Sequence, residues 1–426
     1  MDCLWAPSNE ATTMTTQRMR HRVALVGALD SKYEEYAYLR QRLAEHGVDT
    51  ELIDIGVLSE PGVQPDIQRS VVAAAAGADI ADLAARGDRN AAMTAMATGA
   101  SAIVAEHYRQ RSISGVMVAG GSNAGYVMSR LAAVLPIGCP KVLVSTIVAG
   151  DTRPYVQGSD LIMLYPVVDL AGLNSVSSPI LARAADVLAG IVTAPPVANP
   201  YQGRTAVGCT MFGVTTPCVS RVHDQLTDQG FEVQVFHANG TGGRTLEKMI
   251  TGGAFAAVAD ITTTELADDL LGGVCSAGPD RLTAAARAGI PQVVSVGALD
   301  MVNFGPRETV PERFASRKLF EHNPTVTLMR TSPPECAQLG KIIADRLNAA
   351  TGPVEVHIPA RGFSQISVAE GPFHDRTADE ALIETLRSNL AERVPLTVHD
   401  LAVNDPGFAA IVAQVLTDLL INQNRN

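Results

Sequence analysis

A glycine-rich turn in the second half of the chain has the clearest chemical meaning. The run 233–248 begins with apolar residues typical of a buried strand, passes through Gly240, Gly242 and Gly243, and continues with helix-forming residues. Backbone N–H groups at the start of a helix lack partners within it, and the helix dipole adds partial positive charge at that end. The turn therefore predicts a site for an anion, above all a phosphate.

The same run does not specify the ligand. It lacks the Gly-Lys-Ser/Thr of a P-loop and the third spaced glycine of the dinucleotide-binding fingerprint. His237, Asn239 and Thr241 add polar side chains around the turn, and His237 is a candidate catalytic residue. A glycine-rich connection without a ligand and a purely structural histidine are the alternatives.

A second glycine cluster follows an apolar run at 113–119 and opens a predicted helix. It comprises Gly120, Gly121, Ser122, Asn123 and Gly125. The glycines allow the backbone to approach a phosphate, and the two polar side chains can bind phosphate or cap the helix. Gly120-x-Ser122-x-Ala124 also nearly matches the nucleophile elbow GxSxG, in which Ser122 would attack a carbonyl with an Asp and a His from later in the chain.

Polar side chains also follow two other predicted strands. Asp30 and Lys32 come after the first strand, and a lysine at a helix start, which the dipole disfavours, indicates contact with an anion. The alternative is that Asp30 is simply the N-cap. Thr263 and Thr264 follow a strand at 255–260 and are candidate ligand contacts, although with Glu265 they also satisfy a capping box.

Small hydroxyl residues and an Asp–Arg pair follow the predicted strand at 141–147. Ser145 and Thr146 stand at its end, and Asp151 and Arg153 come after a flexible glycine. Arg153 could neutralise a phosphate, and Asp151 is a candidate catalytic residue. Asp151 or Asp30 could also hold a hydrated Mg²⁺. A capped loop with an internal Asp–Arg pair is the alternative.

Strand-like and helix-like segments alternate along the chain and predict parallel sheets. The first half contains a strand at 22–28, a helix at 33–46, a strand at 49–55, a helical region at 66–111 broken near 86–89, a strand at 113–119, a helix at 125–135, a strand at 141–147 and a helix at 177–192. After the proline-rich 193–200 come strands at 204–210, 231–237, 255–260 and 291–296, with helices at 217–229, 244–251 and 278–288.

The expected fold is two doubly wound, Rossmann-like α/β domains with mainly parallel sheets. We expect a disordered tail at 1–20, a first domain at 21–194, a linker at 195–203 and a second domain at 204–426. Such folds bind ligands beyond the carboxyl ends of their strands, where the clusters above fall. The pentapeptide Val-Gly-Ala-Leu-Asp follows a strand in each half, at 26–30 and 296–300. The proline-rich segment 301–335 is expected to form either an arm that reaches a neighbouring subunit or a loop over its own domain.

Composition narrows the class of function. The net charge of −11 argues against binding to nucleic acid or an anionic membrane. No window of ~18 uncharged apolar residues predicts a membrane span, and the first residues lack the apolar core of a secretory signal, so we expect a cytoplasmic protein. The 6 cysteines show no zinc-binding spacing. An apolar chain with few aromatic residues favours a homo-oligomer, with a two-fold dimer as the commonest case.

In its motifs the chain is similar to the Tm-one-like ATP-binding domain family. The matching stretches run in order from about residue 20 to the end: ALDSK at 28–32, LPIG at 135–138, VST at 144–146, GDTRPY at 150–155, VDLAGLN at 168–174, TMFGVTTP at 210–217, FHANGTGG at 236–243, DITTTEL at 260–266 and GALDMVNF at 297–304. The chain departs from the family at Ala28 and Ser31, where threonines are common, and at Asn123, Ala124 and Tyr126, in a cluster that is often richer in glycine.

The resemblance implies two Rossmann-like subdomains and a nucleotide-binding function. We expect ATP with Mg²⁺, its phosphates at the 120–125 cluster with Lys32 and Arg153 supplying positive charge, and the 240–243 turn as a second anion site that could hold ATP or a small anionic substrate. Two alternatives stay open. One is a hydrolase of ester or C–C bonds that uses Ser122 or His237, and the other is a non-catalytic, nucleotide-gated interaction module.

Overall fold

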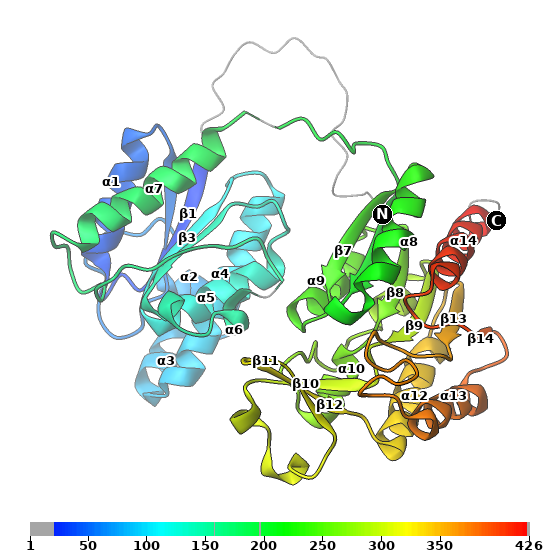
Figure 1. Cartoon of the computed structure of the whole chain (residues 1–426). Coiled ribbons are helices and arrows are strands. Elements are labelled where there is room, and N and C mark those ends of the chain that lie inside the picture. Colours follow the sequence, from blue (N-terminus) through cyan, green and yellow to red (C-terminus); the bar gives the residue numbers. More distant parts are fainter. Residues whose placement is uncertain (1–20, 157, 196, 424–426) are drawn as a thin grey trace. The chain divides into compact units, whose positions relative to one another are not determined.

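The chain forms two compact units, and each is described by itself. The computed structural model describes residues 21–156, 158–195 and 197–423 (Figure 1). The first unit extends to Ala198 and the second begins at Asn199. The tail expected at 1–20 lies outside the described residues.

The first unit is built on a parallel sheet of five strands in the order β2-β1-β3-β4-β5. The strands are β1 (Arg22–Gly27), β2 (Asp49–Asp54), β3 (Val116–Gly120), β4 (Lys141–Ser145) and β5 (Ile162–Leu164). All residues of β3 and β4 are buried, as expected for parallel strands that are covered on both faces.

Helices cover both faces of this sheet. One face carries α1 (Tyr33–Glu45) and α7 (Ser177–Thr193), and the other carries α2 (Arg69–Ala75), α3 (Ile80–Arg86), α4 (Arg89–Arg109) and α5 (Ser122–Val134). The short η1 (Thr146–Ala149) and α6 (Arg153–Val156) follow β4. Because β1 leads to α1 on one face and β3 leads to α5 on the other, the chain parts between these neighbouring strands. The carboxyl ends of two such strands are the place where doubly wound folds have their ligand-binding crevice.

The second unit contains a parallel sheet of six strands in the order β14-β13-β9-β8-β6-β7. They are β6 (Ala206–Met211), β7 (Glu232–His237), β8 (Ala257–Thr262), β9 (Gln292–Gly297), β13 (Val354–Pro359) and β14 (Leu396–His399). The direction in which successive strands are added to the sheet reverses between β6 and β8, as it does between β1 and β3 in the first unit. β7, expected as a buried strand, is instead half exposed because it is an edge strand.

Helices again form a layer on each face. α8 (Thr216–Asp228), preceded by η2 (Gly213–Thr215), and α14 (Pro406–Gln423) share one apolar cluster with the sheet. The other face carries α9 (Thr241–Thr251), α10 (Glu265–Leu271), α11 (Ala284–Ala288), α12 (Pro333–Asn348) and α13 (Arg376–Asn389). The doubly wound α/β fold expected from the alternating pattern is thus confirmed in both units.

The segment expected as an arm or a loop forms a small antiparallel sheet instead. It contains β10 (Met301–Phe304), η3 (Arg307–Thr309), η4 (Glu312–Phe314), β11 (Leu319–Asn323) and β12 (Val326–Arg330), with strand order β10-β12-β11. Val302 and Met329 belong to the same apolar cluster as α12. The sheet is therefore packed on its own unit.

Candidate functional site

Tyr36 joins β1 to β3 at the point where the two strands part. Its buried hydroxyl donates to the carbonyl of Val26 and accepts the N–H of Ala119 at 2.9 Å. A Cβ on Gly27 would lie 2.0 Å from the Tyr36 ring, so residue 27 must be glycine for the ring to fit. Burial raises the pKa of Tyr36 well above its usual range, which keeps the phenol neutral at the base of the crevice.

The start of α5 forms one wall of this crevice. Gly121 is the N-cap and no side chain caps the helix. Among the residues that the structure describes, nothing accepts a hydrogen bond from the N–H of Ser122 or Asn123. Ser145, at the end of β4, donates its hydroxyl to the Gly121 carbonyl at 2.9 Å and so holds the turn in place. The second glycine cluster thus presents unpaired backbone donors at the carboxyl edge of the sheet.

Gly125 has a packing role. A Cβ there would lie 2.1 Å from Ile147 and 3.2 Å from Tyr155, so the glycine lets η1 and α6 pack closely on α5. This packing brings Thr146 and Arg153 to the α5 side of the edge. Arg153 is exposed and forms a two-bond ion pair with Asp151, with distances of 2.9 and 2.8 Å. These hydrogen bonds lower the pKa of Asp151 to about 2.

The turn after β1 forms the opposite wall. One carboxylate oxygen of Asp30 accepts the N–H groups of Val57 at 3.1 Å and Leu58 at 2.9 Å, so Asp30 ties down the loop that follows β2 and does not cap α1. Lys32 is the half-buried N-cap residue of α1. Within the described part of the chain its amine has no carboxylate or other hydrogen-bond partner, so its charge is available to a ligand.

Asp54 is a further residue of this edge that the sequence pattern did not single out. It ends β2 and is fully buried. One of its oxygens accepts the N–H of Leu29 at 3.1 Å and that of Gly56 at 2.8 Å, and the other has no partner in the described residues. Burial raises its pKa. Only Leu52 and Ile53 before it are apolar in β2, and no local pattern marks this acidic residue as part of a site.

The glycine-rich turn of the second unit already contains an anion, supplied by the protein. The buried carboxylate of Glu265, at the start of α10, accepts the N–H of Gly240 at 2.6 Å and that of Gly243 at 3.0 Å. A Cβ on Gly243 would lie 2.0 Å from a Glu265 oxygen. The N-terminus of α9 is therefore an anion site of the predicted kind, and in this structure its anion is an internal side chain.

A buried arginine holds this carboxylate. Arg281 donates to Glu265 at 2.6 Å and to both oxygens of Asp260 at 2.5 and 2.6 Å, and it also contacts Glu247 at 3.3 Å. Glu247 in turn accepts backbone N–H groups at the start of α11, including that of Ala284 at 2.7 Å. Glu265 thus caps the N-terminus of α9 and Glu247 that of α11, and the guanidinium of Arg281 binds both carboxylates.

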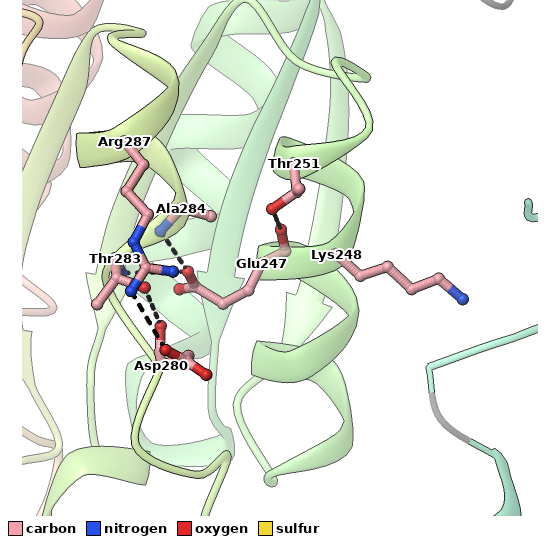
Figure 2. Close-up of a pocket in the computed structure, with 7 residues that line it drawn as sticks. All are labelled: Glu247, Lys248, Thr251, Asp280, Thr283, Ala284 and Arg287. Carbon is pink, nitrogen blue, oxygen red and sulfur yellow. Dashed lines mark hydrogen bonds and ion pairs between the residues drawn. The ribbon is translucent and has the colours of Figure 1, made fainter. Parts of the chain in front are cut away.

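Figure 2 shows a surface pocket of about 250 Å³ next to this buried ion-pair network. It lies between α9 and α11, where the Glu247 carboxylate points towards the Ala284 N–H and the Lys248 chain points away. Its lining residues are Glu247, Lys248, Thr251, Asp280, Thr283, Ala284 and Arg287. No residue predicted for a site lines it.

The other predicted residues of the second unit lie near the carboxyl ends of β7 and β8. His237 is exposed and its ring stacks on Phe212, with centroids 5.2 Å apart. Asn239 accepts the Gly242 N–H at 3.3 Å, while Thr241 is the first residue of α9. These contacts account for each of them within the fold.

Thr263 and Thr264 differ from each other in their bonding. The Thr263 hydroxyl donates to the carbonyl of Ser295 at 3.0 Å. The Thr264 hydroxyl is buried and has no partner in the described residues. Thr263 is therefore explained by the packing of β8 against β9, and Thr264 is not.

Comparison with known proteins assigns the chain to a family. Residues 21–196 match the N-terminal domain and residues 204–420 match the C-terminal domain of the uncharacterised protein family UPF0261. The chain belongs to the UPF0261 family. A UPF0261 protein of Clostridium tetani is 42% identical over 94% of this chain and 100% of its own length. A second one, from Mesorhizobium japonicum, is 43% identical over 93% of this chain and 98% of its own length.

The chain is also similar to a plant protein. The ToMV resistance protein Tm-1(GCR237) of Solanum lycopersicum is 42% identical to this UPF0261 chain over 70% of the chain and 41% of the plant protein. This match confirms the resemblance to Tm-1-like proteins that the motifs indicate. Among solved structures, the UDP-N-acetylglucosamine 2-epimerase from Rickettsia bellii aligns over 95% of the chain and 96% of its own, at 10% identity and a TM-score of 0.22.

The described residues of this UPF0261 chain offer neither a metal-binding cluster nor a membrane span. No cluster of three or more His, Cys, Asp or Glu side chains in the described residues is arranged to hold a metal ion. Across the same residues, every helix is too short or too polar to cross a membrane.

Proposed function

We propose that this protein binds a nucleotide, ATP with Mg²⁺, and that the phosphates lie in the crevice between β1 and β3 of the first unit. The observation that carries the proposal is the uncapped start of α5, where the N–H groups of Ser122 and Asn123 have no partner in the described residues. Phosphate oxygens are the acceptors that such donors bind best. Lys32, on the opposite wall, adds a positive charge whose amine has no partner among the described residues.

The contrast with the second unit favours the first unit for the phosphates. At α9 the N–H groups of Gly240 and Gly243 already bind Glu265, which Arg281 holds in place, and that of Gly242 binds Asn239. A phosphate would have to displace a buried, paired carboxylate there, whereas at α5 it would only displace water. The 240–243 turn stays a candidate for a small anionic substrate only if Glu265 moves.

Mg²⁺ is expected to be held mainly by the phosphates. Because the described residues contain no three-ligand cluster, the protein would supply one or two carboxylates, directly or through water, as is common for Mg²⁺ bound with phosphates. Asp30 and Asp54 each have one carboxylate oxygen free of backbone bonds. Asp151 is engaged with Arg153, so it fits this role only if that pair opens.

A proline at position 122 tests the role of the backbone directly. Ser122 is the first residue of α5, a position where proline is tolerated, and the extended conformation of Gly121 suits a following proline. Ser122→Pro therefore removes one N–H with little effect on the helix, whereas Ser122→Ala keeps it. We expect Ser122→Pro to weaken ATP–Mg²⁺ binding roughly tenfold to a hundredfold, as for loss of a hydrogen bond to a charged group.

Calorimetric titration and thermal shift measure these effects. ATP–Mg²⁺ at about a hundredfold excess over Kd should stabilise the wild type by ~2–3 kcal/mol. Lys32→Met should weaken binding, and Lys341→Met, which removes a lysine from α12 in the other unit, serves as its control. If no nucleotide stabilises the wild type, or if Ser122→Pro binds as well as Ser122→Ala, the proposed site is wrong.

The alternatives have less support. A hydrolase that uses Ser122 or His237 needs a base bonded to the nucleophile, and in the described residues no hydrogen bond joins Ser122 or His237 to another titratable side chain. A nucleotide-gated interaction module requires only the binding proposed above, and ATP binding without phosphate release would favour it over an ATPase. The cytoplasmic location and the homodimer stay predictions, the latter testable by light scattering.

A further inference from the structure

The segment 165–176 links β5, at one edge of the first sheet, to α7, which packs beside α1. It contains the motif VDLAGLN, which the proposed function does not use. Since α7 and α1 share one apolar cluster and β3 and β4 lie between β1 and β5, the segment crosses the carboxyl edge of the sheet towards α1 (Figure 1). This is the edge at which the phosphates are proposed to bind.

The far end of the segment is fixed next to the proposed site. Gly172 donates its N–H to the carboxylate of Glu35, in the first turn of α1, at 2.9 Å. Asn174 accepts the N–H groups of Val176 and Ser177 at 2.9 Å each and so holds the residues that lead into α7. The first turn of α1 begins just after Lys32, the residue proposed to bind the phosphates. These bonds therefore hold the segment within one helical turn of Lys32.

The near end of the segment contains a strained turn. Val167 has a φ of +67°, and the N–H of Val168 donates to the carbonyl of Pro166 at 2.7 Å across it. A positive φ is unusual for any residue with a Cβ and is a clear outlier for a β-branched one. Strain of this kind persists only where the surrounding structure enforces it, and it is found often at sites that switch.

The segment also exposes four large apolar side chains. Tyr165 is 45% exposed, Val167 60%, Leu173 40% and Val176 38%. Four such side chains within twelve residues leave apolar surface in water that a ligand or a rearrangement could cover.

We propose that residues 165–176 form a strap that closes over the bound nucleotide. This inference rests on the proposed function. In closing, the strap pivots about its fixed end at Gly172, Val167 leaves the left-handed region, and the exposed side chains Tyr165 and Val167 cover the base and ribose. Release of the strain and burial of the apolar surface both favour the closed form, so the strap couples nucleotide binding to a change in the shape of this edge.

Two variants of residue 167 in the full chain separate strain from the loss of a side chain. Val167→Gly lets residue 167 adopt the positive φ without strain, which stabilises the described turn and opposes closure. Val167→Ala also loses the valine side chain but keeps a Cβ at the positive φ, so it is the matched control. We expect Val167→Gly to weaken ATP–Mg²⁺ binding roughly tenfold relative to Val167→Ala, because only the glycine variant removes the strain that favours closure.

Hydrogen exchange gives an independent readout. With ATP–Mg²⁺ bound, amides in 165–170 of the wild type should exchange more slowly than without it, and Val167→Gly should reduce this protection. Equal affinities of the two variants, tighter binding by Val167→Gly, or unchanged exchange in a nucleotide-bound wild type would each overturn the strap while leaving the nucleotide site intact. Absence of nucleotide binding by the wild type would overturn the proposed site itself.

Discussion

Replacement of Glu265 tests whether the glycine-rich turn of the second unit is an anion site with a built-in anion. In Glu265→Ala, the N–H groups of Gly240 and Gly243 lose their acceptor and Arg281 loses one of its carboxylates. All of these groups are buried, so water replaces the carboxylate poorly. The second unit should therefore lose stability although the change is away from its apolar clusters.

The magnitude follows from the bonds lost. An unsatisfied buried donor costs about 1–3 kcal/mol, and breaking a buried charge pair costs about 3–5 kcal/mol. The lower figures apply because Arg281 keeps both bonds to Asp260. Two unsatisfied donors and one broken pair then give an expected loss of about 5 kcal/mol. For a unit of this size, that corresponds to a fall of ~10 °C in the melting temperature.

Differential scanning calorimetry measures the change, and formate provides a rescue. Formate can enter the space left by the carboxylate and accept the same N–H groups, so it should restore part of the lost stability in Glu265→Ala at constant ionic strength. Glu308→Ala, which truncates an exposed glutamate in the same unit, is the control and should leave the melting temperature almost unchanged. The reasoning would be refuted if Glu265→Ala had the same melting temperature as this control, or if formate stabilised Glu265→Ala no more than chloride does.

Three further predictions concern packing, titration and the linker. Gly125→Ala should destabilise the first unit by about 1–3 kcal/mol, because its methyl group would lie 2.1 Å from Ile147, whereas Gly121→Ala, with open space around it, should not; urea denaturation compares them. Burial raises the pKa of Asp268 to about 7 and that of Asp300 to about 6, so the folded state holds protons that the unfolded state has lost, and stability should fall as the pH rises from about 4 to 7. Asp300→Asn should weaken this dependence in melting curves. Brief proteolysis should cut first in the exposed stretch 199–204 and release two fragments, and early cuts elsewhere in the described chain would contradict the two-unit division.

The fold was predictable because its signal is local. Buried parallel strands are almost continuously apolar, as in β3 and β4, and amphipathic helices separate them, so the alternating pattern indicates doubly wound sheets. The helix expected at 278–288 begins only at Ala284, because Leu282 has a positive φ and Arg281 enters the core to bind Asp260 and Glu265. Such an override by a buried ion pair cannot be inferred from helix periodicity.

The candidate site was only partly predictable, because its chemistry depends on partners distant in sequence. Glycines mark both turns equally well, but whether their N–H groups are free depends on one carboxylate. Glu265 lies 25 residues from Gly240, and its local pattern indicated a capping box for its own helix. For Glu265 a local pattern suggested the wrong partner, whereas for Asp54 there was no local pattern at all. Nothing near Asp54 in sequence marks the end of β2 as a place where two loops meet.

The repeated pentapeptide shows how position in the sheet decides what the same residues do. After β1, Asp30 is half-buried and ties down the loop after β2, at the crevice where the chain parts. After β9, Asp300 is fully buried, bonds Ser364 at 2.7 Å and has a pKa raised to about 6 by burial. Only the first copy lies at a reversal of strand order, because β9 stands between β8 and β13 with crossovers in one direction. The proposed ligand-binding role therefore belongs to the place where the sheet parts, and the same five residues elsewhere become part of the core.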